Sequence, residues 1–201
     1  MTVLVRTTLL MLAIGAGFPG PSPGPSPGPI SVPLATDLNG HPVTELAPPG
    51  TRAVVLFFAA SDCPISNRYI PEMQRLAKQF EPLGVRVWFV YPNPGDTAEV
   101  VRAHDREFAI GAYTALDRSQ TLTRMAHATI TGEAAVFVPH GESLREVYRG
   151  RIDDRYLALG SERPQAAHHD LEEAIRAVLA ARAVPQPGGP SVGCSIVTRQ
   201  P

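Results

Sequence analysis

Two cysteines are the residues of this sequence whose chemistry is most specific. Cys63 and Cys194 stand 131 positions apart in a chain of 201 residues. A thiolate attacks disulfide and peroxide bonds, and a second thiol can resolve the intermediate that forms. Two cysteines are too few for a disulfide scaffold or for a zinc site built from cysteine alone. They therefore form a redox pair, act as a permanent staple or take no part in function.

Cys63 is expected at the start of a helix, directly after a buried strand. The apolar run Ala53–Ala60 (AVVLFFAA) has the length and composition of a strand that helices cover on both faces. Pro64 favours the first turn of a helix, and an apolar stripe at helical spacing follows it. Unpaired N–H groups and the helix dipole at such a position favour a thiolate. Asp62 opposes this effect and Arg68 supports it, so the direction of the pKa shift stays open at this point.

The other hydrophobic patterns predict alternating strands and helices. Strands are expected at residues 53–60, 85–91, 112–116, 134–138 and 144–149. Helices are expected to begin at residue 64 and to cover residues 97–108, 119–127 and 166–183. An Asn-Gly turn within residues 37–43 predicts a small hairpin ahead of the first core strand. This order predicts an α/β fold with a three-layer sheet, right-handed crossovers and a terminal antiparallel hairpin.

Both ends of the chain differ in composition from the middle. Residues 1–17 place one Arg ahead of a short apolar stretch and read as a signal peptide, whose apolar core is too short to span a bilayer as a mature helix. An uncleaved N-terminal anchor or a buried helix is the alternative. Residues 18–31 form a Pro/Gly/Ser-rich linker, residues 32–184 the folded domain, and residues 185–201 a flexible Pro/Gly-rich tail that carries Cys194. We therefore expect an exported protein, periplasmic or extracellular, whose cysteines meet an oxidising compartment.

Composition and charge narrow the classes of partner. With 44% hydrophobic and 18% charged residues, the chain is not disordered as a whole. Its formal net charge of −1 provides no basic excess to neutralise phosphates, so nucleic acid is not an expected partner. The sequence contains no nucleotide-binding Gly-rich loop, Ser-His-Asp order or H-E-x-x-H motif.

Three segments together resemble a known family. Residues 61–72 (SDCPISNRYIPE) resemble the active-site region of exported bacterial redoxins, which are thioredoxin-fold proteins of the alkyl hydroperoxide reductase and thiol-specific antioxidant group. Residues 148–154 (YRGRIDD) and 193–196 (GCSI) resemble further segments of that branch. The resemblance implies a thioredoxin-like three-layer α/β/α sandwich with a mixed central sheet and an N-terminal hairpin extension. It also implies a thiol oxidoreductase, either a disulfide reductase or a peroxiredoxin-like peroxidase, without organic cofactor or metal, and reduced by an external thiol protein.

Two departures from the family affect the nucleophile. Thioredoxins use Cys-x-x-Cys, whereas the fourth position here is Ser66, so Cys63 has no resolving partner within its own turn. Typical peroxiredoxins place Pro and Thr or Ser seven and three residues before the reactive cysteine, and those positions hold Leu56 and Ala60. A local dithiol shuttle is therefore excluded, and the usual peroxide pocket is in doubt.

A third departure affects the expected substrate groove. The fold normally has a cis-proline after a Thr opposite the cysteine, and Gly132 follows Thr131 here. A non-proline cis bond costs several kcal/mol, so we expect a trans bond and an altered groove. By resemblance, the residues expected to contact substrate are Pro64, Ser66, Arg68, Thr131 and Gly132.

Three hypotheses follow for the pair of cysteines. In the first, Cys63 attacks a disulfide or hydroperoxide and Cys194, from the same or a neighbouring subunit, resolves the intermediate. In the second, the protein binds or delivers copper with the help of His127, because soft thiolates suit Cu(I). In the third, the protein is a non-catalytic binding module in which the two cysteines form a stable disulfide.

Overall fold

The computed structural model describes residues 32–197. The predicted signal peptide (1–17) and linker (18–31) lie outside the described residues and stay predictions. Within residues 32–197, no helix is long and apolar enough to cross a membrane.

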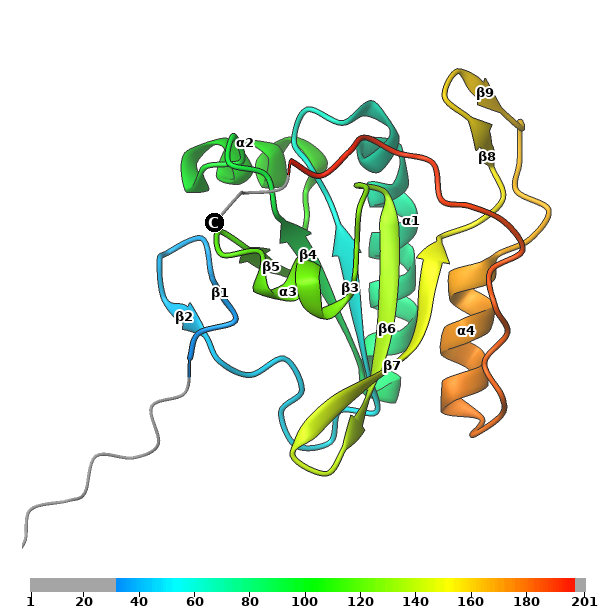
Figure 1. Cartoon of the computed structure of the whole chain (residues 1–201), viewed down its shortest axis with the longest axis horizontal. Coiled ribbons are helices and arrows are strands. Elements are labelled where there is room, and N and C mark those ends of the chain that lie inside the picture. Colours follow the sequence, from blue (N-terminus) through cyan, green and yellow to red (C-terminus); the bar gives the residue numbers. More distant parts are fainter. Residues whose placement is uncertain (1–31, 198–201) are drawn as a thin grey trace, which may run out of the picture. The chain divides into compact units, whose positions relative to one another are not determined.

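A seven-stranded mixed sheet forms the centre of this domain, with the strand order β2-β1-β5-β4-β3-β6-β7 (Figure 1). Strands β3, β4 and β5 run parallel to one another, whereas β6 is antiparallel to β3, β7 to β6, and β1 to both β5 and β2. The strands are β1 (Ala35–Thr36), β2 (Pro42–Val43), β3 (Ala53–Phe58), β4 (Val85–Tyr91), β5 (Tyr113–Leu116), β6 (Glu133–His140) and β7 (Ser143–Arg151). The mixed sheet, the N-terminal hairpin β1–β2 and the hairpin β6–β7 confirm the predicted arrangement.

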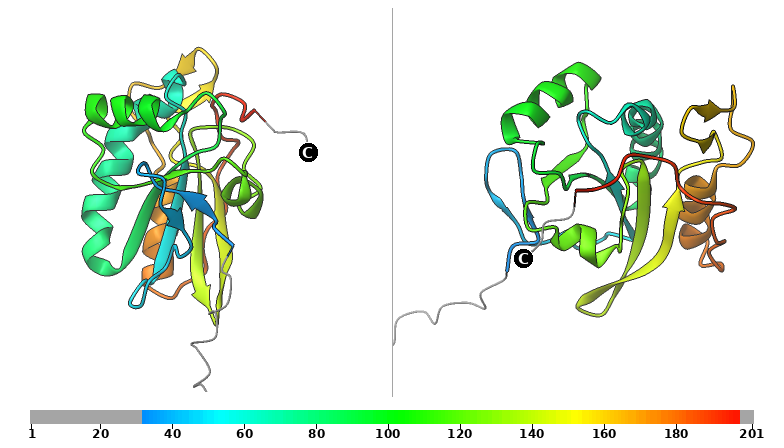
Figure 2. Two further views of the ribbon diagram at one scale, coloured as in Figure 1. Left: turned by 90° about the vertical axis from the view of Figure 1, so that its left-hand side faces the viewer. Right: turned by 45° about the horizontal axis from the view of Figure 1, so that its top comes forward.

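Helices cover one face of the sheet more fully than the other. The helices are α1 (Pro64–Phe80), α2 (Ala98–Phe108), α3 (Thr121–Met125) and α4 (Asp170–Leu179), and a short 3-10 turn, η1 (Glu81–Leu83), follows α1. One core cluster joins β3 to α1 and α4, and the second joins the other face of β3 to α3 and to the segment around Leu46. The edge-on view in Figure 2 shows the sheet between these two layers.

Local sequence explains why α1 begins where it does. Pro64 occupies the first turn, where its missing N–H costs no hydrogen bond, and Cys63 is the N-cap residue with an extended backbone. Ile70, Met73 and Leu76 recur at helical spacing and are fully buried against the sheet. This packing fixes the start of the helix at the carboxyl end of β3.

The last helix is shorter than its periodicity predicts. We expected residues 166–183, and α4 covers Asp170–Leu179. The backbone N–H groups of Ala167 and His168 donate to the carboxylate of Asp154 at 2.6 and 2.9 Å, which holds this stretch as a loop. The small hairpin formed by β8 (Tyr156–Ala158) and β9 (Ser161–Glu162) was also not predicted.

Part of the predicted tail belongs to the folded body. We expected residues 185–201 to act as a spacer outside the core; whether the segment moves stays a prediction. In the structure, Ile196 is buried in the second core cluster, while Val192 and Cys194 pack against the first. Ile130 and Ser195 form an isolated antiparallel bridge. In Figure 1 this segment, drawn in red, crosses the top of the domain above the start of α1.

Candidate functional site

Cys63 closes a tight turn between β3 and α1. Its N–H donates to the carbonyl of Ala60 at 3.2 Å, and its own carbonyl accepts the N–H of Asn67 at 3.0 Å, which begins the hydrogen bonding of α1. As the N-cap residue, Cys63 holds its side chain beside the unpaired N–H groups of the first helical turn. Hence the predicted position of this sulfur at a helix start agrees with the structure.

Ser66, at the position where thioredoxins carry a second cysteine, holds this turn together. Its hydroxyl lies 3.1 Å from the carbonyl of Ala60 and 3.2 Å from that of Cys63. The side chain is fully buried. Its hydroxyl therefore stabilises the turn that carries Cys63, and its expected role in substrate binding stays a prediction.

The tail brings Cys194 to Cys63 by adding a short extended segment beside residues 129–131. The N–H of Thr131 donates to the carbonyl of Cys194 at 2.8 Å, and the N–H of Ile196 donates to the carbonyl of Thr129 at 2.9 Å. The hydroxyl of Thr131 also reaches the Cys194 carbonyl, at 3.3 Å. This pairing positions Cys194 through its backbone.

Gly193 is required for this close approach. A Cβ atom built on Gly193 would lie 1.7 Å from the carbonyl oxygen of Thr131, closer than any side chain tolerates. Gly132 has a φ of +81°, a left-handed conformation that favours glycine, and its N–H donates to the carbonyl of Phe58 at 2.7 Å. The described residues contain no cis peptide bond, so the expected trans bond between Thr131 and Gly132 is confirmed.

The tail is anchored on both sides of Cys194. On one side, the N–H of Gly188 donates to the carboxylate of Asp170 at 2.8 Å. On the other side, the N–H of Val197 donates to the Asn93 side chain at 2.9 Å, and the Gln120 amide donates to the carbonyl of Val197 at 2.7 Å. In this arrangement Cys194 lies next to Cys63 of the same chain.

The surroundings of Cys63 favour its thiolate. Burial raises the pKa of the Cys63 thiol. Four hydrogen bonds lower it by a larger amount, and they come from the Cys194 side chain, the N–H of Ser66, the Thr131 hydroxyl and the Cys194 backbone. The pKa of Cys63 therefore lies below its ordinary value. Arg68 is not among these causes, because its guanidinium lies 3.5 Å from Glu162 on β9. The sequence suggested that Arg68 stabilises the Cys63 thiolate, whereas in the structure hydrogen-bond donors around Cys63 lower its pKa.

Cys194 is affected in the opposite direction. Burial, the hydrogen bond to Cys63 and the negative charge of Cys63 together raise the pKa of Cys194 to about 11, and Asp62 adds to this rise. Both cysteines are free thiols in the structure. Cys63 is therefore the more readily ionised of the two, and the Cys194 thiol can donate a hydrogen bond to its thiolate.

Solvent reaches the two sulfurs unequally. The Cys63 residue is 1% exposed, whereas Cys194 is half-buried. A shallow hollow of about 220 Å³ lies over the first turns of α1 and is bordered by Pro64, Ile65, Arg68 and the β8–β9 hairpin; Cys63 itself does not line it. Of the expected substrate contacts, Pro64 and Arg68 line this hollow, while Thr131 is buried behind the tail.

A group of polar residues that the sequence did not indicate forms hydrogen bonds around Ser61, two residues before Cys63. The carboxylate of Asp96 accepts both the N–H of Ser61, at 3.0 Å, and the Ser61 hydroxyl, at 2.6 Å. The amide of Asn67 donates to the Ser61 carbonyl at 3.0 Å, and its oxygen lies 2.9 Å from Nε2 of His104. The sequence offered one signal for this group, the amide residue Asn67 on the first turns of the helix that begins at Pro64.

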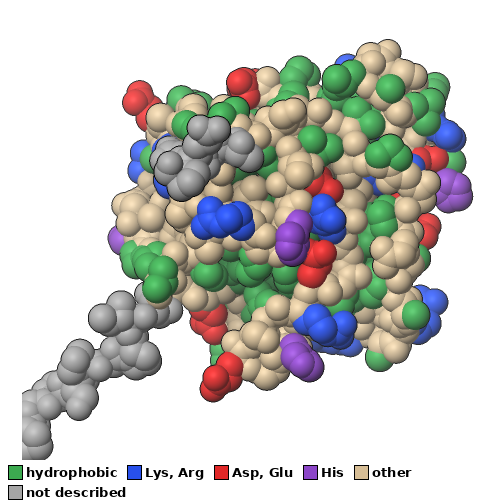
Figure 3. Space-filling view, viewed as in Figure 1, with side chains coloured by type: hydrophobic (Ala, Val, Ile, Leu, Met, Phe, Trp, Pro, Cys, Tyr) green, Lys and Arg blue, Asp and Glu red, His purple; other side chains and the backbone are tan. Residues whose placement is uncertain are grey.

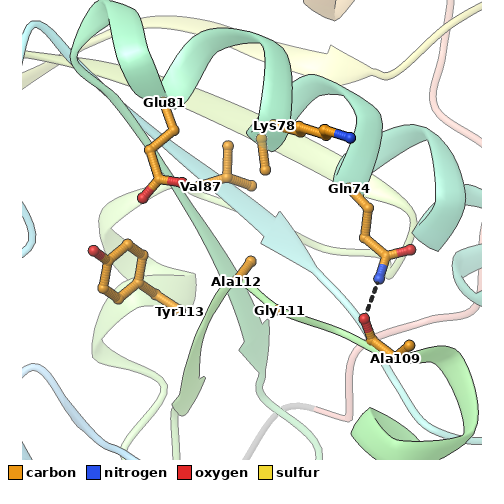
Figure 4. A pocket seen from close by; sticks show the side chains of 9 residues that line it. Gln74, Lys78, Glu81, Val87, Ala109, Gly111, Ala112 and Tyr113 are labelled. Carbon is orange, nitrogen blue, oxygen red and sulfur yellow. Dashed lines mark hydrogen bonds between the residues drawn. The ribbon is translucent and has the colours of Figure 1, made fainter.

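Other features of the surface contain no comparable chemistry. A cavity of about 290 Å³ between α1 and β5 is lined by Gln74, Lys78, Glu81 and Tyr113 and holds no cysteine (Figure 4). In the view of Figure 3, Lys and Arg lie scattered among Asp, Glu and hydrophobic side chains, without a patch of one sign. Within residues 32–197, no three His, Cys, Asp or Glu side chains are grouped as a metal site would require.

The fold is shared with solved structures. An uncharacterized conserved protein from Geobacillus kaustophilus is 26% identical, with a TM-score of 0.68 over 84% of this chain and 90% of that one. A hypothetical protein from Sinorhizobium meliloti 1021 is 25% identical, with a TM-score of 0.68 over 81% of this chain and 88% of that one. MTB dsbF, solved in mixed oxidized and reduced forms, is 20% identical, with a TM-score of 0.52 over 73% and 92% of the two chains. This last likeness shows the thioredoxin-like fold.

Family assignment rests on residues 30–148, which match the AhpC/TSA family. No curated protein matches the chain. The matched region contains Cys63 and the Thr131–Gly132 loop, and it ends before Cys194. Because the match spans more than half of the sequence and the sheet has the thioredoxin-like arrangement, this chain belongs to the AhpC/TSA family of redoxins.

Proposed function

We propose that this protein is a thiol oxidoreductase in which Cys63 is the nucleophile and Cys194 of the same chain is the resolving thiol. The observation that carries the proposal is the contact between the two side chains, in which Cys194 lowers the pKa of Cys63 while Cys63 raises that of Cys194. A nucleophile must be a thiolate at neutral pH, and a proton-bearing neighbour that stabilises it is also poised to resolve its product.

With a hydroperoxide, the Cys63 thiolate attacks the distal oxygen and the O–O bond breaks. This step yields a sulfenic acid on Cys63 and, after protonation, an alcohol or water. The Cys194 thiol then attacks the Cys63 sulfur, so that the disulfide forms and water leaves. With a disulfide substrate, Cys63 forms a mixed disulfide and expels one thiolate, and Cys194 expels the second. In both cases two electrons pass from the two cysteines to the substrate.

The substrate is therefore a protein disulfide or a hydroperoxide, and an external thiol protein returns the pair to the dithiol state. Pro64 and Arg68 border the hollow over the first turns of α1 and supply a surface for the substrate. Thr131 holds the tail through its N–H, and Gly132 lies between Ile65 of α1 and Val192 of the tail. Export remains part of the proposal, because a compartment that oxidises thiols supplies the substrates that such a pair reduces.

Two rival roles make different demands on the same residues. A permanent staple resists reduction, with a potential below about −300 mV, whereas a working pair is reduced readily. The opposite pKa shifts of the two thiols favour a working pair, since a structural disulfide needs no stabilised thiolate. Copper binding needs His127 near Cys63, and it would be supported if Cys63→Ala and His127→Ala each abolished stoichiometric binding of copper.

The test combines mass spectrometry with three proteins: the wild type, Cys63→Ser and Cys194→Ser. One equivalent of hydrogen peroxide or of an oxidised protein substrate is added to the reduced sample. We expect the wild type to lose two hydrogens and form the Cys63–Cys194 disulfide. Cys194→Ser should stop at a sulfenic acid or mixed disulfide, and Cys63→Ser should lose activity. Full activity of Cys63→Ser would overturn the proposal.

A further inference from the structure

We propose that His104, acting through Asn67, is a positioning residue for the nucleophile Cys63. This inference rests on the proposed function, because positioning matters only if Cys63 reacts. The two side chains come from different helices, Asn67 from α1 and His104 from α2. They act on the backbone of the turn that leads to Cys63, which is a role that the reaction itself does not assign.

The hydrogen bonds of these two side chains have only one possible direction. The Ser61 carbonyl can only accept, so the Asn67 group that lies 3.0 Å from it is the amide nitrogen. The Asn67 oxygen can only accept as well, and it lies 2.9 Å from Nε2 of His104, so this nitrogen carries a proton. On the other side of the ring, Nδ1 lies 3.0 Å from the Tyr91 hydroxyl and can accept from it. A neutral imidazole with its proton on Nε2 satisfies all three bonds.

The ring of His104 is enclosed and kept neutral. It is 4% exposed and contacts the rings of Tyr91 and Phe108, at centroid distances of 5.8 and 4.7 Å. Burial lowers the pKa of His104, and the negative charges of Asp96 and Glu107 offset this effect only in part. The ring is therefore a well-packed donor that stays uncharged at neutral pH.

Ser61 links this hydrogen-bonded chain to Cys63. The N–H and hydroxyl of Ser61 donate to Asp96, and its carbonyl accepts the Asn67 amide, so the residue is held on both sides. Two residues later, the N–H of Cys63 donates to the Ala60 carbonyl and closes the turn. Because Ser61 lies inside this turn, holding its carbonyl restricts the path of the backbone that places the Cys63 side chain.

Loss of this support would move the sulfur relative to its donors. The N–H of Ser66 and the Thr131 hydroxyl lower the pKa of Cys63, and they belong to other parts of the backbone. Hydrogen bonds weaken with distance and tilt, so a displaced turn should raise the pKa of Cys63. The reaction with Cys194 is equally sensitive, because a misplacement of about 1 Å can slow a step by about 100-fold.

The test measures both the pKa and the reaction rate of Cys63 in variants of the full chain. The pKa is taken from the pH dependence of alkylation with a phosphine as reductant, and alkylated Cys63 is read from the tryptic peptide that ends at Arg68. The rate is that of disulfide formation after a peroxide pulse. We expect Asn67→Ala and His104→Leu to raise the pKa and to slow disulfide formation at least about tenfold.

Two further variants separate positioning from stability. Gln74→Ala removes another amide of α1 that donates to two backbone carbonyls, and it should lower stability without changing the pKa or the rate. His104→Gln keeps an N–H donor for Asn67 and should stay closer to the wild type than His104→Leu in both measurements; an equal loss in the two variants would contradict the role of the donor.

The outcomes distinguish this inference from the proposed function. If Asn67→Ala and His104→Leu lose only stability, as Gln74→Ala does, the inference is overturned and the proposed function stands. If the wild type forms no Cys63–Cys194 disulfide, the proposed function is overturned, and the inference with it.

Discussion

The clearest test of the site's construction is Gly193→Ala. A methyl group at this position would lie 1.7 Å from the carbonyl oxygen of Thr131, so one of the two backbones must move. Overpacking of this kind costs about 1–3 kcal/mol of folding free energy. The strain acts directly on the hydrogen bond from the N–H of Thr131 to the carbonyl of Cys194, which places the resolving thiol. We therefore expect both lower stability and slower formation of the Cys63–Cys194 disulfide.

Gly111→Ala is the matched control for this change. A Cβ on Gly111 meets nothing within 4 Å, and the residue does not have a left-handed backbone. Its substitution should leave stability unchanged or raise it by about 0.4–1 kcal/mol through the entropy of the unfolded chain. Both variants are compared by urea unfolding under reducing conditions and by the rate of disulfide formation after a peroxide pulse. If Gly193→Ala matches Gly111→Ala in both assays, the placement of the tail against Thr131 is wrong.

Three further changes test the electrostatics and the supports of the pair. Formation of the Cys63–Cys194 disulfide closes a loop of 131 residues and should stabilise the protein by up to about 5 kcal/mol, measured as the difference between urea unfolding with and without reductant; Cys194→Ser should show no such difference. In a pH titration of thiolate absorbance, Cys63 should ionise below the pH of an ordinary cysteine. Cys194→Ala should move this transition to higher pH because the thiol that donates to Cys63 is lost; a transition that stays in place contradicts the contact. In the Cys63→Ser variant the pKa of Cys194 should fall from about 11, since the charge that raises it is gone. Asn67→Ala removes the side chain that bonds the Ser61 carbonyl and the His104 ring, so the free energy of unfolding in urea should fall by about 1–3 kcal/mol. Lys78→Ala, on an exposed part of the same helix, should change this free energy little.

The fold could be predicted from the sequence because its signals are local. The apolar run Ala53–Ala60 can only be a covered strand, and Pro64 marks the first turn of the helix that follows. The position of Cys63 follows from these two features without any knowledge of distant residues. The start of α4 could not be predicted in this way, because the Asp154 carboxylate that captures the N–H groups of Ala167 and His168 is far away in sequence.

The sequence left open whether Cys194 acts together with Cys63, and the way in which the tail is placed could not be predicted. Pro and Gly residues in the tail indicate a spacer, and composition does not reveal that Ile196 finds a place in the core. The role of Gly193 depends on the approach of one particular carbonyl, that of Thr131, which only the folded chain provides. The hydrogen bonds of Ser66 to the carbonyls of Ala60 and Cys63 likewise could not be predicted, because they depend on the shape of the turn.

The pairing of the tail with residues 129–131 also provides a way to follow the redox state without observing sulfur. In the dithiol form, the amide protons of Thr131 and Ile196 are held only by the short ladder that they help to build, and local opening of the tail would release both to deuterium. A disulfide at Cys194 would tie that ladder to the start of α1, so the same two amides should exchange more slowly after oxidation. The exchange rates of these two amides would then report the fraction of molecules that contain the disulfide, even in a mixture of both forms.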